Sequence, residues 1–107
     1  MSENDRSEVQ EGRSTVEALR AARERISDPE RWTQEFDAVD GKASASDSLL
    51  ALPEGRSRDR AWALLTVIAE HLGFSNIPDA NDSGPRTVAH ARVLLMFDKA
   101  IEKAEAI

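Results

Sequence analysis

Arg60-Ala-Trp-Ala-Leu-Leu-Thr-Val-Ile-Ala-Glu-His-Leu-Gly73 is the stretch that decides the fold of this chain. Apart from Thr66, every residue between Arg60 and Glu70 is apolar. A helix that is apolar on nearly all sides must be covered on nearly all sides. The run is much shorter than the roughly 20 apolar residues that cross a bilayer. It therefore predicts the central helix of a small soluble core, which ends at a left-handed Gly73.

An amphipathic helix is expected ahead of this central segment. It begins at the capping box Ser14-Thr-Val-Glu17, in which the serine and glutamate side chains each accept from the other's backbone N–H. Its apolar stripe has helical spacing and consists of Val16, Leu19, Ala22 and Ile26. Ser27-Asp28-Pro29 ends the helix, because proline suits a first helical turn and not a helix interior. The turn that follows is expected to direct Trp32 into the core as an anchor.

A further helix is expected near the end of the chain, from Thr87, a suitable N-cap, to about Ala104. Its broad apolar face comprises Val88, Ala91, Leu94, Leu95, Phe97, Ile101 and Ala104. The segment from Phe74 to Pro85 is crowded with residues that hydrogen-bond their own backbone. We expect it to be a loop, with Ile77 as its apolar plug.

The segment between the first two helices contains Asp40-Gly41, a strong hairpin signal where the neighbouring residues can form strands. Asp37 and Ala38 are poor strand residues, so either a short hairpin or an ordered turn is expected near residues 33–45. Further along, Leu49-Leu-Ala-Leu52 is expected to form one helical turn that packs on the core. Asp59 is a candidate cap for the central helix.

Together these patterns predict a mainly α fold, a small single domain of three principal helices around a central apolar helix. Residues 1–13 are polar and charged and cannot bury enough surface to offset their ordering entropy. We therefore expect a disordered polar tail over residues 1–13 and a single helical domain over residues 14–107.

The composition narrows the class of protein. The chain has 107 residues, enough for one domain, of which 40% are hydrophobic and 32% charged. It has no cysteine, which excludes disulfides and thiolate metal sites and fits a reducing cytoplasm. The net charge of −6 is spread along the chain, without the basic patch that nucleic acid requires. No secretory leader or spanning stretch is visible. We expect a cytoplasmic protein that binds neither nucleic acid nor a membrane.

The sequence shows no assembled catalytic site. It has no glycine-rich phosphate loop and no Gly-x-Ser-x-Gly elbow. Its two histidines, His71 and His90, are on different helices without metal-ligand spacing, so no metal site and no cofactor are expected. His71 is well placed to stabilise the dipole at the end of the central helix, whereas His90 is expected at the surface. Catalysis is therefore the less favoured alternative.

Several short motifs, taken in their order along the chain, are similar to those of an uncharacterised family. They are Ile26-Ser-Asp-Pro-Glu-Arg-Trp-Thr-Gln34, Asp40-Gly41, the apolar run after Arg60-Ala-Trp62, Ile77-Pro-Asp-Ala-Asn-Asp82, Thr87-Val88 and Lys99-Ala-Ile101. The chain resembles a domain of unknown function from actinobacteria and their phages, over roughly residues 18–105.

Members of that family usually carry a tryptophan–cysteine pair and a Gly-Ala step in the central helix. The matching positions here are Trp62-Ala63 and Leu65-Thr66, so any role of that cysteine is missing. The loss of the small glycine implies a differently packed helix crossing. The resemblance supports the extent of the domain and brings no activity with it.

The function favoured by these observations is a small acidic, non-catalytic domain that binds another protein or a second copy of itself. A domain of this size often gains stability by associating. The candidate contact residues are Met96 and Phe97, with the neighbouring Arg92. A variant of this hypothesis is a regulator or inhibitor, encoded by a phage or its host, that acts by binding a protein target.

The alternative is a small-molecule-binding protein or enzyme that uses the Asn81-Asp82 loop with His71. Three arginines ahead of the central helix, Arg56, Arg58 and Arg60, would complete that site by holding an anion. Pairing of these arginines with the acids elsewhere on the chain is the favoured interpretation. The alternative requires the loop, the histidine and the arginines to meet around one cavity.

Overall fold

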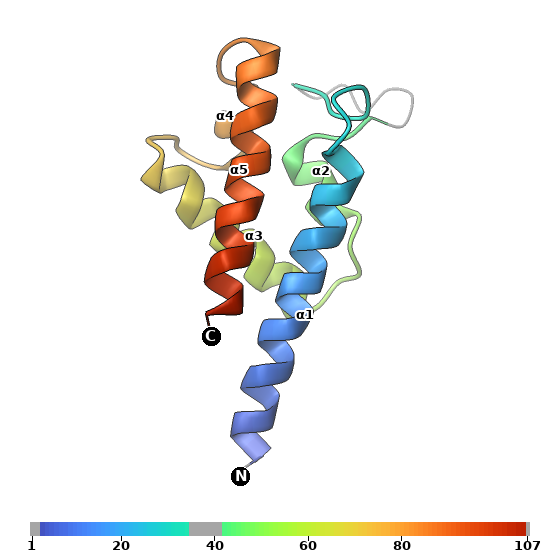
Figure 1. Cartoon of the computed structure of the whole chain (residues 1–107), viewed down its shortest axis with the longest axis vertical. Coiled ribbons are helices and arrows are strands. Elements are labelled where there is room, and N and C mark those ends of the chain that lie inside the picture. The colour runs from blue at the N-terminus through green and yellow to red at the C-terminus, as the bar shows by residue number, and fades with distance from the viewer. Residues whose placement is uncertain (1–2, 35–41, 107) are drawn as a thin grey trace.

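Five helices make up the computed structural model of the chain, which describes residues 3–34 and 42–106, with side chains from residue 13 onward (Figure 1). They are α1 (Glu3–Ile26), α2 (Ala45–Leu50), α3 (Arg56–His71), α4 (Ile77–Asp82) and α5 (Arg86–Glu105). Within these two ranges no strand forms, apart from an isolated bridge between Trp32 and Ala43. The predicted mainly α fold with three principal helices is confirmed. None of the described helices is long and apolar enough to cross a membrane.

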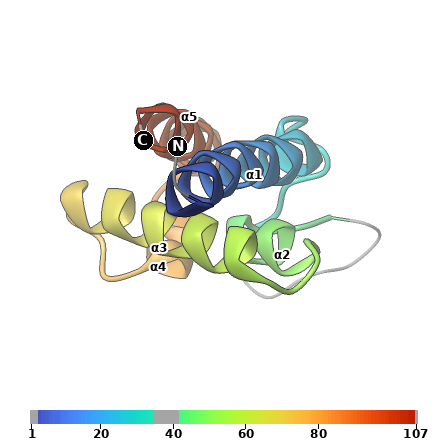
Figure 2. The ribbon, with the colours of Figure 1, turned by 90° about the horizontal axis from the view of Figure 1, so that it is seen from below.

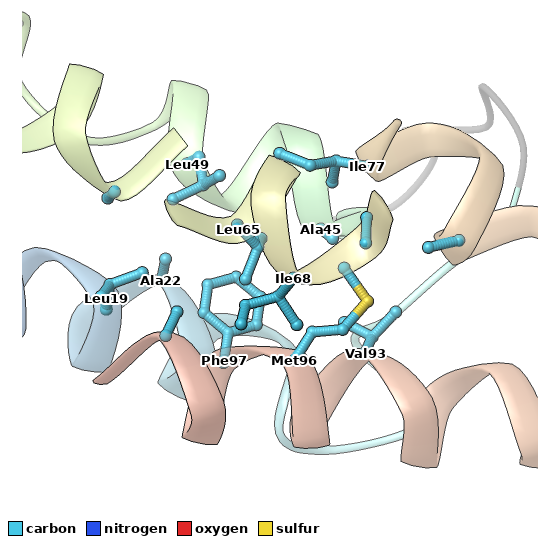
Figure 3. Packing of buried hydrophobic residues seen from close by; sticks show 14 of the residues in the cluster. Leu19, Ala22, Ala45, Leu49, Leu65, Ile68, Ile77, Val93, Met96 and Phe97 are labelled. Carbon is cyan, nitrogen blue, oxygen red and sulfur yellow. The ribbon is translucent and has the colours of Figure 1, made fainter. Parts of the chain in front are cut away.

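The helices lie in two layers, with α1 and α5 in one and α2, α3 and α4 in the other (Figure 2). α1 packs against α2, α3 and α5, and α4 packs against α5. Side chains from all five helices meet between the layers, and Leu19, Leu65 and Phe97 are fully buried there (Figure 3). The central position expected for α3 is thus confirmed.

The apolar run of α3 is covered on one broad side and not all round. Ala61, Leu65, Ile68 and Ala69 are buried, whereas Val67 is exposed. The expectation that the run is enclosed on nearly all sides is wrong, because α1 and α5 cover one face of α3 and the short helices α2 and α4 cover only part of its flank. Trp62, on the flank of the buried face, is only partly covered.

α3 begins one turn earlier than expected. Its N-cap is Gly55, with φ of 152°, so Asp59 lies inside the first turn and is not the cap. At the other end, Gly73 has φ of 94°, as predicted. The Gly73 N–H donates to Glu70 O at 3.0 Å and the Phe74 N–H to Ala69 O at 3.0 Å. These two bonds form a Schellman motif, which satisfies carbonyl groups that the end of the helix would otherwise leave unpaired.

α1 begins at Glu3 and not at the Ser14 capping box, so that expected helix start is wrong. Gly12 and Ser14 lie inside the helix, since their propensity penalties, about 1 kcal/mol or less each, are too small to break a long helix. The N-terminal turns of α1 extend past the end of α5 (Figure 1). The division into a tail over residues 1–13 and a domain over residues 14–107 stays a prediction.

The remaining boundaries follow local capping. Residues 77–82, expected to be loop, form α4, because the Asn76 side chain accepts from Asp79 N at 2.8 Å and Pro78 suits the first turn. Ile77 is buried, as predicted. α5 begins at Arg86 after Pro85, so Thr87 is not its cap.

The Asp40-Gly41 turn lies outside the described residues. The two flanks of that segment are joined by hydrogen bonds from Thr33 N to Ala43 O at 3.1 Å and from Ala43 N to Arg31 O at 2.8 Å. This bridge is parallel, whereas the strands of a hairpin are antiparallel.

The short helix expected around Leu49 is confirmed as α2. Its N-cap is Ser44, whose hydroxyl accepts from Asp47 N at 3.2 Å while Asp47 Oδ2 accepts from Ser44 N at 3.1 Å. This reciprocal capping box compensates for the short length of α2, because both ends of an isolated six-residue helix would be unsatisfied. Leu49 is fully buried and anchors α2 to the core.

Substitution of Gly73 by alanine should lower the free energy of unfolding by about 1–2 kcal/mol, because an L side chain is strained at this φ. A Cβ added there would contact nothing within 4 Å, so the cost is conformational and not steric. Gly73→Asn is the matched control and should cost less, because asparagine tolerates the left-handed region. Urea unfolding of the three proteins measures both effects, and equal midpoints for all three would contradict the assignment.

Candidate functional site: the Asn81 cluster and the Trp62 groove

Asn81 is fully buried, and its side chain is held by four hydrogen bonds. Its Oδ1 accepts from Trp32 Nε1 at 2.7 Å and from Ala45 N at 3.0 Å. Its Nδ2 donates to Thr33 O at 3.1 Å and to Asp82 Oδ1 at 2.8 Å. The carboxamide thus makes two acceptor and two donor bonds, which is its full ordinary capacity. We call these five residues the Asn81 cluster.

The Asn81 cluster joins parts of the chain that are far apart in sequence. It fixes the first residue of α2, the C-terminal end of α4 and the segment after α1 to one another. Gln34 adds to this contact, because its Nε2 donates to Gly84 O at 3.1 Å and to Asp82 O at 3.3 Å. The position of α2 relative to α4 is therefore set by hydrogen bonds as well as by apolar packing.

Trp32 is the buried aromatic anchor that the sequence predicts, and it is enclosed by polar groups. The His90 ring lies 5.1 Å from the Trp32 ring between centroids, and the Arg86 guanidinium lies 5.0 Å from it. Arg86 also donates to Trp32 O at 2.7 Å and to Pro29 O. The indole is thus fixed by a cation on its face and by Asn81 at its N–H.

His90 is buried, so its expected surface position is wrong. Its Nε2 lies 2.7 Å from Ile26 O, within hydrogen-bond distance of the carbonyl at the end of α1. That carbonyl is one of the groups a helix end leaves unpaired, and the imidazole N–H is a suitable donor for it. His90 therefore serves the packing of α5 on α1.

A groove of about 240 Å³ lies between α2, α3 and α4, next to the Asn81 cluster. We call it the Trp62 groove, and its lining residues are Ser44, Ser46, Asp47, Leu50, Trp62, Pro78, Asn81 and Asp82. Trp62 contributes from α3, Leu50 from α2 and Pro78 from α4, so each of the three helices supplies an apolar wall. The sequence places Trp62 in the first turns of the central helix and gives no sign that it borders a groove.

The polar groups in the groove are of two kinds. Asp47 and Asp82 are carboxylates: Asp47 Oδ2 accepts a hydrogen bond from Ser44 N, and Asp82 Oδ1 accepts one from Asn81 Nδ2. Ser46 Oγ is buried and has no hydrogen-bond partner in the described part of the chain. An unsatisfied buried hydroxyl costs about 1–3 kcal/mol, so a donor or acceptor that reached Ser46 would be favoured.

His71 lies elsewhere, in a hollow of about 430 Å³ between the C-terminal ends of α3 and α5. Ile68, Leu72 and Ala106 line its apolar part, and Lys99, Glu102 and Lys103 surround it. His71 is in the last turn of α3, the position expected for stabilising the helix dipole. Neither Asn81 nor Asp82 lines this hollow.

The three arginines ahead of the central helix do not converge with these residues. Arg58 lies 3.8 Å from Glu54 and donates to Leu52 O at 3.4 Å, beside the connector from α2. Arg60 lines a different hollow, with Thr15. Arg56 is exposed at the start of α3. Arg58 points to a different side of α3 from Arg56 and Arg60, because residues two apart do not share a helix face, whereas residues four apart do.

The residues expected to contact a partner belong to the core. Met96 and Phe97 are fully buried, on the face of α5 that also presents Val93 and Ala100. Arg92 donates to Ala80 O at 2.9 Å and to Ser83 O at 2.8 Å, and its guanidinium lies 4.5 Å from the Phe74 ring centroid. In this fold Met96 and Phe97 are not accessible, so an interaction surface must use other residues.

Residues 10–103 match a family described as a family of unknown function, DUF6197. The chain belongs to this family. The match confirms the resemblance to an uncharacterised family. Searches of curated proteins and of solved structures gave no match. Within the described residues, no group of three or more histidine, aspartate or glutamate side chains is arranged to hold a metal ion.

Replacement of Asn81 by alanine should lower the free energy of unfolding by about 3 kcal/mol or more. It leaves the Trp32 N–H, the Ala45 N–H and the Thr33 carbonyl, all buried, without partners. His71→Ala is the matched control and should change stability by less than about 0.5 kcal/mol, because His71 is exposed. Chemical denaturation measures both, and a loss at Asn81 no larger than that at His71 would show that the cluster does not hold the fold.

Proposed function

We propose that this chain is a non-catalytic protein-binding domain and that the Trp62 groove is its contact surface. The observation that carries the proposal is the pairing of Trp62 with Leu50 at the groove. Leu50 is 56% exposed, the largest exposed fraction among the large hydrophobic side chains of the described residues. It lines the same groove as the partly buried Trp62. Contact with a partner would remove both apolar surfaces from water.

The rigidity of the groove supports binding. Binding energy at interfaces concentrates on a few aromatic and apolar anchors in well-packed sites. Side chains that are already ordered lose less conformational entropy on association. The capping box holds Asp47 and the Asn81 cluster holds Asp82, so two of the polar groups of the groove are positioned before a partner arrives.

The chemistry of the groove favours binding over catalysis. The four hydrogen bonds of Asn81 to the protein leave it no group for a substrate. Of the two histidines, His90 is turned to the carbonyl of Ile26 and His71 lines the separate hollow. General acid–base catalysis needs a titratable group within reach of the reacting atoms and poised near the working pH, and imidazole is the usual choice.

A second copy of the chain and a protein target regulated by binding are both versions of this function. In each case the same apolar contact at Leu50 and Trp62 would be buried. Light scattering on the purified chain distinguishes them, because self-association raises the apparent mass with concentration and a different partner leaves it unchanged.

Small-molecule binding in the same groove is the second candidate, and it is favoured by the Ser46 hydroxyl, which has no partner among the described residues. Such a site would include Asn81 and Asp82 of the ligand site considered from the sequence, but neither His71 nor the three arginines. The volume weighs against it, because drug-sized ligands occupy pockets of about 300–1,000 Å³, above the size of this groove. A protein segment that enters only with one or two side chains suits the smaller volume.

A photo-crosslinking amino acid at Leu50 tests the contact surface in the native host. We expect a covalent adduct with one protein species, or with a second copy of the chain, from position 50. The same amino acid at Glu24, an exposed position on α1, is the matched control and should give no such adduct. A Trp62→Ala substitution in the Leu50 crosslinking protein should reduce the yield severalfold, with folding checked by circular dichroism.

Equal adducts from positions 50 and 24 would mean that the crosslinks are non-specific. An adduct that persists undiminished after Trp62→Ala would place the contact outside the groove. Either result would remove the support for the proposed surface.

A further inference from the structure

The titratable groups that line the Trp62 groove all carry the same sign of charge. Asp47 comes from α2 and Asp82 from α4, and no lysine, arginine or histidine is among the described lining residues. The hollow at the ends of α3 and α5 differs, because Lys99 and Lys103 there are mixed with Glu102. An apolar groove bordered by two carboxylates is complementary to a guest that is apolar along its length and cationic at its end.

The aromatic wall of the groove favours the same guest. Arginine and lysine cations are attracted to the face of an indole ring, most strongly where water is partly excluded. The alkyl part of such a side chain would lie against Leu50 and Pro78, while its charged head reached the carboxylates. Ser46 Oγ, which has no partner in the part of the chain that the structure describes, could accept a hydrogen bond from the head group after rotation about χ1.

Two arginines of the chain itself already contact an aromatic ring in this way. Arg86 lies 5.0 Å from the Trp32 ring while it donates to carbonyl oxygens, and Arg92 lies 4.5 Å from the Phe74 ring while it donates to two more. In both, a guanidinium combines an aromatic face with oxygen acceptors. The Trp62 groove is lined by an indole side chain and by carboxylate groups, without an arginine in its described lining.

From these observations we infer that the Trp62 groove receives an arginine side chain, with a flanking apolar residue, from a partner protein. The inference rests on the proposed function and specifies its partner as a basic–apolar protein segment. Arginine suits the site better than lysine because its planar head has five donors for separate acceptors, here Asp47, Asp82 and Ser46. Self-association fits less well, because two copies that each carry a net charge of −6 repel one another.

Titration of the full chain with short peptides tests the inference by nuclear magnetic resonance. The probe is acetyl-Leu-Arg-Leu-amide, and acetyl-Leu-Gln-Leu-amide and acetyl-Leu-Glu-Leu-amide are its matched controls. Each of the two tryptophans gives one indole N–H signal, and the signal of Trp62, which lines the groove, is the reporter. We expect the arginine peptide to shift the signals of Trp62, Ser46 and Leu50 and to bind more tightly than either control.

A protein that carries both Asp47→Asn and Asp82→Asn tests whether the negative charge of the groove, and not only its shape, contributes to binding. Each asparagine keeps an oxygen that can accept the present bond from Ser44 N or Asn81 Nδ2, and removes the negative charge. The arginine peptide should bind this protein about fivefold more weakly, as the loss of two partly exposed ion pairs implies. The glutamine peptide should bind both proteins equally. The unfolding midpoint of the variant checks that α2 and α4 are intact.

The outcomes separate this inference from the proposed function. If all three peptides shift Trp62 equally, or the paired substitution leaves the affinity for the arginine peptide unchanged, the cationic guest is overturned and the protein contact stands. If no peptide shifts Trp62 although position 50 crosslinks a protein, the arginine assignment is again overturned. If neither experiment gives a signal, both proposals fall.

Discussion

The hydrogen bond from the Trp32 indole to the Asn81 carboxamide is the interaction on which the rest of the structure depends. Both side chains are fully buried, so neither can turn to water if the other is removed. The remaining bonds of Asn81 then tie the start of α2 and the end of α4 to this pair. A buried amide that makes all its hydrogen bonds holds its neighbours in one arrangement, whereas a buried amide that lacks a partner lowers the stability of the fold. The fold is therefore held by the hydrogen bonds of the Asn81 cluster as well as by its apolar core.

The features that could be predicted from the sequence are those decided by local patterns. Gly73 ends α3 because a glycine follows an apolar helical run, and Ile77 is buried because it is the one large aliphatic residue between Ser75 and Pro85. Trp32 is an anchor because a tryptophan after a proline turn has a large apolar surface, which is removed from water when it is buried in the core. In each case a residue type and its near neighbours contain the physical reason.

The features that could not be predicted depend on partners distant in sequence. His90 is buried because the carbonyl of Ile26 needs a donor, and Asn81 is a structural centre because four groups from separate segments converge on it. The predicted apolar face of the last helix is right for Phe97 and wrong for Val88 and Leu95, which are exposed, and the sequence also assigns the buried Met96 and Phe97 to a partner. The packing of all five helices decides which apolar residues remain outside, and it leaves Leu50 and not Met96 exposed. The groove itself is a consequence of two short helices meeting the side of α3.

The hydrogen bonds by which the Asn81 cluster joins α2 to α4 also determine which parts of the molecule unfold together in a local opening. Each of these helices has six residues, too few to persist alone in water. Because one amide oxygen bonds both the Trp32 indole and the first N–H of α2, loss of any one of these elements releases the others. The two short helices and the segment after α1 therefore form a single cooperative unit, whose backbone amides exchange with solvent in the same opening event.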